Sequence, residues 1–113
     1  MSREPLLYLE DIVKACRKIL RYTEGMSFTD FIADERTFDA VIRNIEIVGE
    51  AVKKIPETIK IEYDQVEWRA MAALRNIVAH AYFNVKEEII WDIIQNKIEP
   101  LHIHIEKIIS DID

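Results

Sequence analysis

Apolar residues recur at three- and four-residue steps along most of the chain, which is the spacing that places them on one face of an α-helix. The first stripe predicts a helix from near Pro5, which suits a first helical position, to Gly25. This stripe consists of Leu6, Leu9, Val13, Cys16 and Leu20. The following Ser27-Phe28-Thr29-Asp30 segment resembles a capping box and predicts a short helix through Phe31 and Ile32.

A second stripe predicts a long helix from Asp34 to Ile55, where Pro56 ends it. Its apolar members are Phe38, Val41, Ile45, Val48, Val52 and Ile55. Gly49 lies inside this helix, where glycine costs about 1 kcal/mol relative to alanine. We therefore expect a neighbouring helix to approach closely at Gly49.

The second half of the chain predicts three further helices. Residues 56–64 form a connector with room for one helical turn. Asp64-Gln65-Val66-Glu67 offers a capping signature for a third long helix, whose apolar residues are Trp68, Met71, Leu74 and Val78. Asn84 is placed to cap a fourth helix with an inward face of Ile89, Ile90, Ile93 and Ile94. Pro100 interrupts or restarts the chain before a last, isoleucine-rich helix from Leu101 to Ile112.

Composition supports the helical interpretation. The 113 residues include only two glycines and three prolines, and no repeat or linker-like segment divides them. We expect one all-α domain over residues 1–113, an antiparallel bundle of four to five helices. No apolar run approaches the roughly 20 residues of a membrane span, and Met1 to Pro5 lacks the features of a signal peptide. The expected location is cytoplasmic, with the single Cys16 as a small core residue.

Charge narrows the function classes. The formal net charge of -6 is the opposite of the basic footprint with which proteins bind long nucleic acids through their phosphates. This argues against a general nucleic-acid-binding module. It remains compatible with an enzyme that concentrates a few positive charges in a cleft.

Most enzyme signatures are absent from the sequence. There is no glycine-rich phosphate loop, no G-x-S-x-G elbow and no paired-cysteine metal site. His102 and His104 are two residues apart, so on a helix they point about 200° apart and do not ligate one metal from the same face. We predict no metal and no cofactor.

The segment from Arg75 to Tyr82 is the exception. On a helix that advances about 100° per residue, Arg75 and Tyr82 share one face within about 20°. Asn76 and His80 are four residues apart, so their side chains can touch. His80 lies about 140° around the axis from Arg75, a gap that arginine's length, a frayed last turn or a second subunit could close. Spacing alone also fits a purely structural role, with His80 as a capping residue and Arg75 stacked on Tyr82.

The string from Arg75 to Phe83 resembles the R-x4-H-x-Y motif of HepT-like proteins in the HEPN superfamily. The resemblance continues in the same order over nearly the whole chain. The other matching segments are Tyr8-Leu9-Glu10-Asp11-Ile12, residues 22–28, residues 40–51, Trp68-Arg69 and Ile90-Trp91.

This resemblance implies a metal-independent endoribonuclease that acts as the toxin of a toxin–antitoxin pair. Arg75 and His80 match the catalytic arginine and histidine of the family, Asn76 a supporting polar residue, and Tyr82 the motif tyrosine. Family members form homodimers in which the two motifs face a shared cleft. The implied partner is a minimal nucleotidyltransferase antitoxin that transfers AMP from ATP onto the motif tyrosine, here Tyr82. This chain lacks the G-S…D-x-D pattern of such a transferase, so it is the expected acceptor.

Two alternatives belong to other classes. One is a non-catalytic helical module that binds a nucleotide or the transferase, and the other is a structural helix-bundle adaptor. The presence of Arg75, His80 and Tyr82 together favours the nuclease. Alanine at Arg75 or His80 discriminates the adaptor, because it would then change nothing beyond stability.

Overall fold

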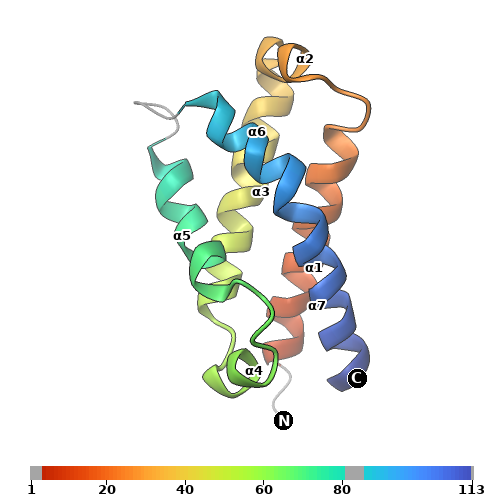
Figure 1. Cartoon of the computed structure of the whole chain (residues 1–113), viewed down its shortest axis with the longest axis vertical. Coiled ribbons are helices and arrows are strands. Elements are labelled where there is room, and N and C mark those ends of the chain that lie inside the picture. Colours follow the sequence, from red (N-terminus) through yellow and green to blue (C-terminus); the bar gives the residue numbers. More distant parts are fainter. Residues whose placement is uncertain (1–3, 81–85, 113) are drawn as a thin grey trace.

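The computed structural model describes residues 4–80 and 86–112, and Figure 1 shows their arrangement. The described residues form seven helices and no strand. Five helices have ten or more residues and two have six. The helices are α1 (Glu4–Tyr22), α2 (Phe28–Ala33), α3 (Glu35–Lys53), α4 (Glu57–Glu62), α5 (Trp68–Ala79), α6 (Glu87–Asn96) and α7 (Ile98–Ile112). The predicted all-α bundle is confirmed, with the short helices α2 and α4 added to its five longer ones.

Helices α1, α3 and α7 form the centre of the bundle. Helix α3 packs against both α1 and α5, and α1 also packs against α7. Figure 1 shows α1 and α3 running in opposite directions, with α5 on the outer side of α3 and α7 beside α1. Six of the fully buried aliphatic side chains belong to the predicted stripes: Leu9, Val41, Ile45, Val48, Val52 and Ile90. The others were not named in those stripes: Ile12, Ile19, Ile98, Ile105 and Ile108. The core therefore lies chiefly between α1, α3 and α7.

The turn between α1 and α3 follows the local signals in the sequence. Gly25 has a φ of 76°, a left-handed conformation that glycine adopts without steric cost. At the start of α2, the Asp30 amide donates to Ser27 Oγ at 3.1 Å and the Ser27 amide donates to Asp30 Oδ2 at 3.0 Å. Asp34 then caps α3 by accepting the Thr37 amide at 3.1 Å. The predicted capping box and the predicted start of the second long helix are both confirmed.

An aromatic cluster joins α2 and α6 to the N-terminal end of α3. The buried Phe31 ring lies 5.5 Å from Phe38 and 5.3 Å from Trp91, between ring centroids. Aromatic pairs at such distances prefer tilted arrangements, and both pairs here are tilted. The cluster thereby anchors the beginning of the C-terminal half of the bundle.

The predicted cap of the third long helix is wrong. The residue before α5 is Glu67, which makes no side-chain capping hydrogen bond. The turn before α5 is instead held by a buried side chain and by two hydrogen bonds that Trp68 donates. Val66 is buried, the Trp68 amide donates to the Val66 carbonyl at 2.8 Å, and the Trp68 indole donates to the Tyr63 carbonyl at 3.0 Å. Burial of two large apolar side chains therefore determines where this helix begins.

Three details of the last helices also differ from the prediction. Helix α6 begins after Lys86, and Asn84, its predicted cap, lies outside the described residues. Ile89 is 45% exposed, because it lies about 90° from the centre of the buried stripe of α6. The chain resumes its helix at Ile98, so Pro100 lies inside the first turn of α7, where a missing amide hydrogen breaks no intrahelical bond.

None of the helices in the described ranges is long and apolar enough to cross a membrane.

Candidate active site

Helix α5 presents two contrasting faces. Its residues include alanine, leucine and methionine, which are strong helix formers. Trp68, Met71, Leu74 and Val78 are buried, and α5 packs mainly on α3. Arg75 and Asn76 are exposed to solvent. Asn76 lies on the side opposite the buried residues, Arg75 lies at the edge that contacts α3, and His80 follows directly after the helix. Packing thus holds one side of α5 and leaves its polar side chains accessible.

Gly49 allows α3 and α5 to approach closely at Arg75. A Cβ atom at position 49 would lie 2.9 Å from the Arg75 backbone nitrogen and 3.1 Å from its Cβ. The expected close approach of a neighbouring helix at this glycine is confirmed. The contact fixes the backbone of Arg75 against α3, since two packed helices cannot slide past each other without a clash.

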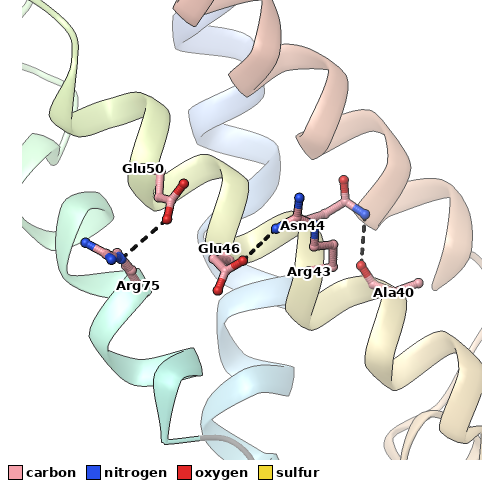
Figure 2. A network of polar contacts seen from close by, with 6 residues as sticks. All are labelled: Ala40, Arg43, Asn44, Glu46, Glu50 and Arg75. Carbon is pink, nitrogen blue, oxygen red and sulfur yellow. Dashed lines mark hydrogen bonds and ion pairs between the residues drawn. The ribbon is translucent and has the colours of Figure 1, made fainter.

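The Arg75 side chain extends from this contact toward an acidic residue of α3. Its Nε atom lies 3.5 Å from Glu50 Oε1, and both side chains are 50% exposed. Figure 2 shows the pair between the two helices. Glu50 directly follows Gly49 in α3. An exposed pair of this kind contributes little to stability.

His80 lies at the point where α5 ends. Its φ of -96° and ψ of 3° place it outside the helix as the C-cap residue, and its amide donates to the Ile77 carbonyl at 3.3 Å. The side chains of His80 and Asn76 are both exposed. Among the described residues, no hydrogen bond joins Asn76 to His80. The contact that their spacing permits stays a prediction.

Tyr82 lies outside the described residues. Helix α5 ends at Ala79, three residues before it. The common face of Arg75 and Tyr82, which assumed a continuous helix, stays a prediction.

The charge of α5 contrasts with that of the whole chain. The helix carries Arg69 and Arg75 and no acidic residue, whereas the formal net charge of the protein is -6. A helix with a net positive charge in an otherwise acidic protein favours the binding of a small anion. It is therefore consistent with local recognition of a phosphate.

The remaining candidate side chains are held in structural contacts. Cys16 is buried, which raises the pKa of its thiol to about 12 and keeps it from reacting as a thiolate. His102 Nε2 lies 2.7 Å from Glu106 Oε1, and Glu106 Oε2 lies 3.4 Å from Arg17 on α1. In the part of the chain that the structure describes, no group of three or more His, Cys, Asp and Glu side chains could hold a metal ion.

Sequence reasoning assigned no role to Glu50. It belongs to the segment of residues 40–51 that carries the family resemblance, but its position relative to Arg75 depends on tertiary structure. The available signal was its place directly after Gly49, the glycine expected to lie against another helix. A charged residue beside such a contact lies within reach of the partner helix.

Fold and site together define a helical-bundle domain with exposed Arg75, Asn76 and His80 at the end of one helix. The chain matches the family described as "Ribonuclease HepT-like" over residues 12–108, which include all three residues. The chain therefore belongs to the HepT-like ribonuclease family.

Two relatives illustrate the match. The chain is 44% identical to "Putative RNase MJ0127" of Methanocaldococcus jannaschii, over 94% of this chain and 88% of that protein. It is 40% identical to "Probable ribonuclease HepT" of Thermococcus cleftensis, over 96% of this chain and 98% of that protein. No solved structure matches the chain.

Proposed function

We propose that this protein is a metal-independent endoribonuclease whose reaction is carried out by Arg75 and His80. The observation that carries the proposal is the exposure of Arg75, Asn76 and His80 at the end of α5, within the region that matches the ribonuclease family. The absence of acidic residues from α5 adds electrostatic support. Ribonuclease activity is also the activity named for the two relatives.

The proposed chemistry uses each residue type for one task. His80 takes the proton from a ribose 2′-hydroxyl, whose oxygen attacks the adjacent phosphorus, and a proton is returned to the leaving 5′-oxygen. A histidine in this role contributes roughly 10²–10⁴-fold to the rate. Arg75 stays protonated and binds two phosphate oxygens through its planar fork, stabilising the charge that builds up on phosphorus. The products are a cyclic phosphate and a free 5′-hydroxyl.

Two further residues support this chemistry. Asn76 is exposed one position after Arg75, so it can orient His80 or the phosphate once RNA is bound. Tyr82 follows two positions after His80 and is proposed to stack on a base. Neither residue needs to transfer a proton.

A homodimer would solve the geometric problem of the site. Arg75 and His80 are five residues apart and point about 140° apart on an ideal helix. Ala70 and Ala73 are exposed and lie three residues apart on one side of α5, where small side chains allow another helix to approach closely. In the proposed dimer, a second copy places its own Arg75 and His80 across a shared cleft.

The biological role proposed is that of a cytoplasmic toxin with a minimal nucleotidyltransferase as its antitoxin. The transferase would attach AMP to the Tyr82 hydroxyl and release pyrophosphate from ATP. The added phosphate is anionic, and Tyr82, which would carry it, follows seven positions after Arg75 in the sequence. It would therefore compete with RNA phosphate for the same arginine.

The test is expression of the protein with and without a minimal nucleotidyltransferase, measuring growth, RNA integrity and intact mass. The proposal predicts growth arrest and RNA cleavage by the wild type, neither by His80→Ala, and an AMP-sized mass increase on co-expression that Tyr82→Phe abolishes. RNA cleavage that persists in His80→Ala would contradict the catalytic assignment. Nucleotide binding without any cleavage would favour the non-catalytic module.

A further inference from the structure

We infer that Glu50 is a positioning residue for Arg75, and that it holds the guanidinium in the orientation that binds the scissile phosphate. The inference rests on the proposed function, because it concerns how the proposed phosphate-binding arginine is prepared. It adds a residue from α3 to a site otherwise built from the end of α5.

The contact is made at the inner nitrogen of the arginine. Glu50 Oε1 lies 3.5 Å from Arg75 Nε. An arginine has one N–H on Nε and two on each terminal nitrogen, all in one plane. A carboxylate beside Nε leaves the terminal nitrogens accessible for two phosphate oxygens. Figure 2 shows the Glu50 carboxylate approaching the guanidinium from the α3 side.

The base of the same side chain is fixed by the neighbouring residue of α3. The Arg75 backbone nitrogen lies so close to Gly49 that a Cβ there would be 2.9 Å away. Consecutive residues of α3 therefore constrain Arg75 at two points, its backbone and its Nε atom. A half-exposed arginine has many accessible rotamers, and a second point of contact reduces the number that it samples.

Glu50 could instead act as a rival anion that RNA must displace. The two roles have opposite kinetic signatures. A rival anion weakens binding, so its removal lowers KM and leaves kcat unchanged or higher. A positioning residue acts on the orientation needed in the transition state, so its removal lowers kcat with little effect on KM.

The experiment compares Glu50→Gln with the matched variant Glu106→Gln. Glu106 also pairs with an arginine across two helices, at 3.4 Å from Arg17, and its side chain is 45% exposed. This pair joins α1 to α7, away from α5. Cleavage of an end-labelled random-sequence RNA gives apparent kcat and KM for both variants, the wild type and His80→Ala. Thermal unfolding of each variant monitors the fold.

We expect Glu50→Gln to lower kcat about ten-fold with KM within about two-fold of wild type, and Glu106→Gln to change neither. Glu50→Asp should restore part of the lost kcat, because it keeps the charge. The Nε–H signal of Arg75 in a proton–nitrogen NMR spectrum gives a readout besides activity. It should move and exchange faster with water in Glu50→Gln but stay unchanged in Glu106→Gln.

The outcomes separate the inference from the proposed function. Equal kcat for Glu50→Gln and Glu106→Gln would overturn the inference while leaving the proposed function intact, provided that His80→Ala is inactive. A lower KM with unchanged kcat in Glu50→Gln would also overturn it and identify Glu50 as the rival anion. RNA cleavage by His80→Ala at the wild-type rate would refute the proposed function, and the inference with it.

Discussion

Helices α1 and α5 both pack against α3, but α1 is packed against a second helix as well, whereas α5 leaves one side exposed. Helix α1 has 19 residues, seven of them buried, and contacts α7 as well as α3. Helix α5 has 12 residues, four of them buried, and packs mainly on α3. The difference indicates that α1 belongs to the part of the molecule that stabilises the fold, whereas α5 is held on one side only. Its outer side is therefore available for chemistry.

The largest effect on stability is expected in the centre of the bundle. Ile45 on α3 is fully buried, and its replacement by alanine removes three methyl or methylene groups from the core. We expect Ile45→Ala to lower the free energy of unfolding by about 2–5 kcal/mol, measured by urea denaturation. Ile61→Ala is the control, because Ile61 is 69% exposed and should change the value by less than about 0.5 kcal/mol. Similar losses in both variants would refute the placement of the core.

The contact between α3 and α5 comes next in size. In Gly49→Ala the new Cβ would meet the Arg75 backbone at 2.9 Å. The overpacking cost should exceed the gain in helix propensity and leave a net loss of about 1–2 kcal/mol. RNA cleavage should fall as well, since Arg75 must move with its backbone.

Gly25→Ala provides the matched comparison for that variant. No atom lies within 4 Å of the added Cβ, but the φ of 76° is unfavourable for alanine. We expect a stability loss of about 1–2 kcal/mol from the backbone alone, with cleavage per folded molecule unchanged. Unchanged cleavage in Gly49→Ala would contradict the role assigned to the α3–α5 contact.

A smaller, pH-dependent effect is expected at the start of α3. The Thr37 amide donates to Asp34, and this bond, followed by the Thr37 hydroxyl bond, lowers the pKa of the Asp34 carboxyl below its usual value. The stabilisation is present above the unfolded-state pKa and is lost as the pH falls through the folded-state pKa. Asp34→Ala should therefore lower Tm slightly at neutral pH, and the difference should shrink below about pH 4. Asp39→Ala, on the exposed side of α3, should show no such pH-dependent difference.

The smallest effect concerns Cys16 in α1. Its buried thiol has a pKa raised to about 12, so the reactive thiolate is scarce at neutral pH. A thiol-reactive dye should label the native protein slowly and the urea-unfolded protein rapidly. Rapid labelling of the native protein would show that α1 is not firmly packed, which would contradict its assignment to the part of the molecule that stabilises the fold.

Local and periodic signals predicted much of the fold. The apolar stripes predicted the long helices, Ser27 and Asp30 predicted the capping box, and Gly49 predicted a close helix contact. The errors arose where tertiary packing dominates local signals. Trp68 and the buried Val66 determine the start of α5, while Ile89 lies outside the buried face of α6 because three other isoleucines fill it.

The candidate site, too, could be predicted from the sequence only in part. Arg75, Asn76 and His80 could be identified from one short segment, and the structure places all three on an exposed surface. The partner of Arg75 could not be identified from that segment. Glu50 lies 25 positions earlier in the chain, and only the packing of α3 on α5 brings its carboxylate to Arg75 Nε.

The central claim is that the outer face at the end of α5 carries the chemistry while the core carries the stability. The most direct test measures RNA cleavage and thermal unfolding side by side for purified wild type and His80→Ala, with a metal chelator present throughout. The account predicts RNA with cyclic phosphate ends from the wild type. It also predicts a loss of at least about 10²-fold in the cleavage rate for His80→Ala, with Tm unchanged because the side chain is exposed. Cleavage by His80→Ala at the wild-type rate, or its loss only together with the fold, would contradict the account.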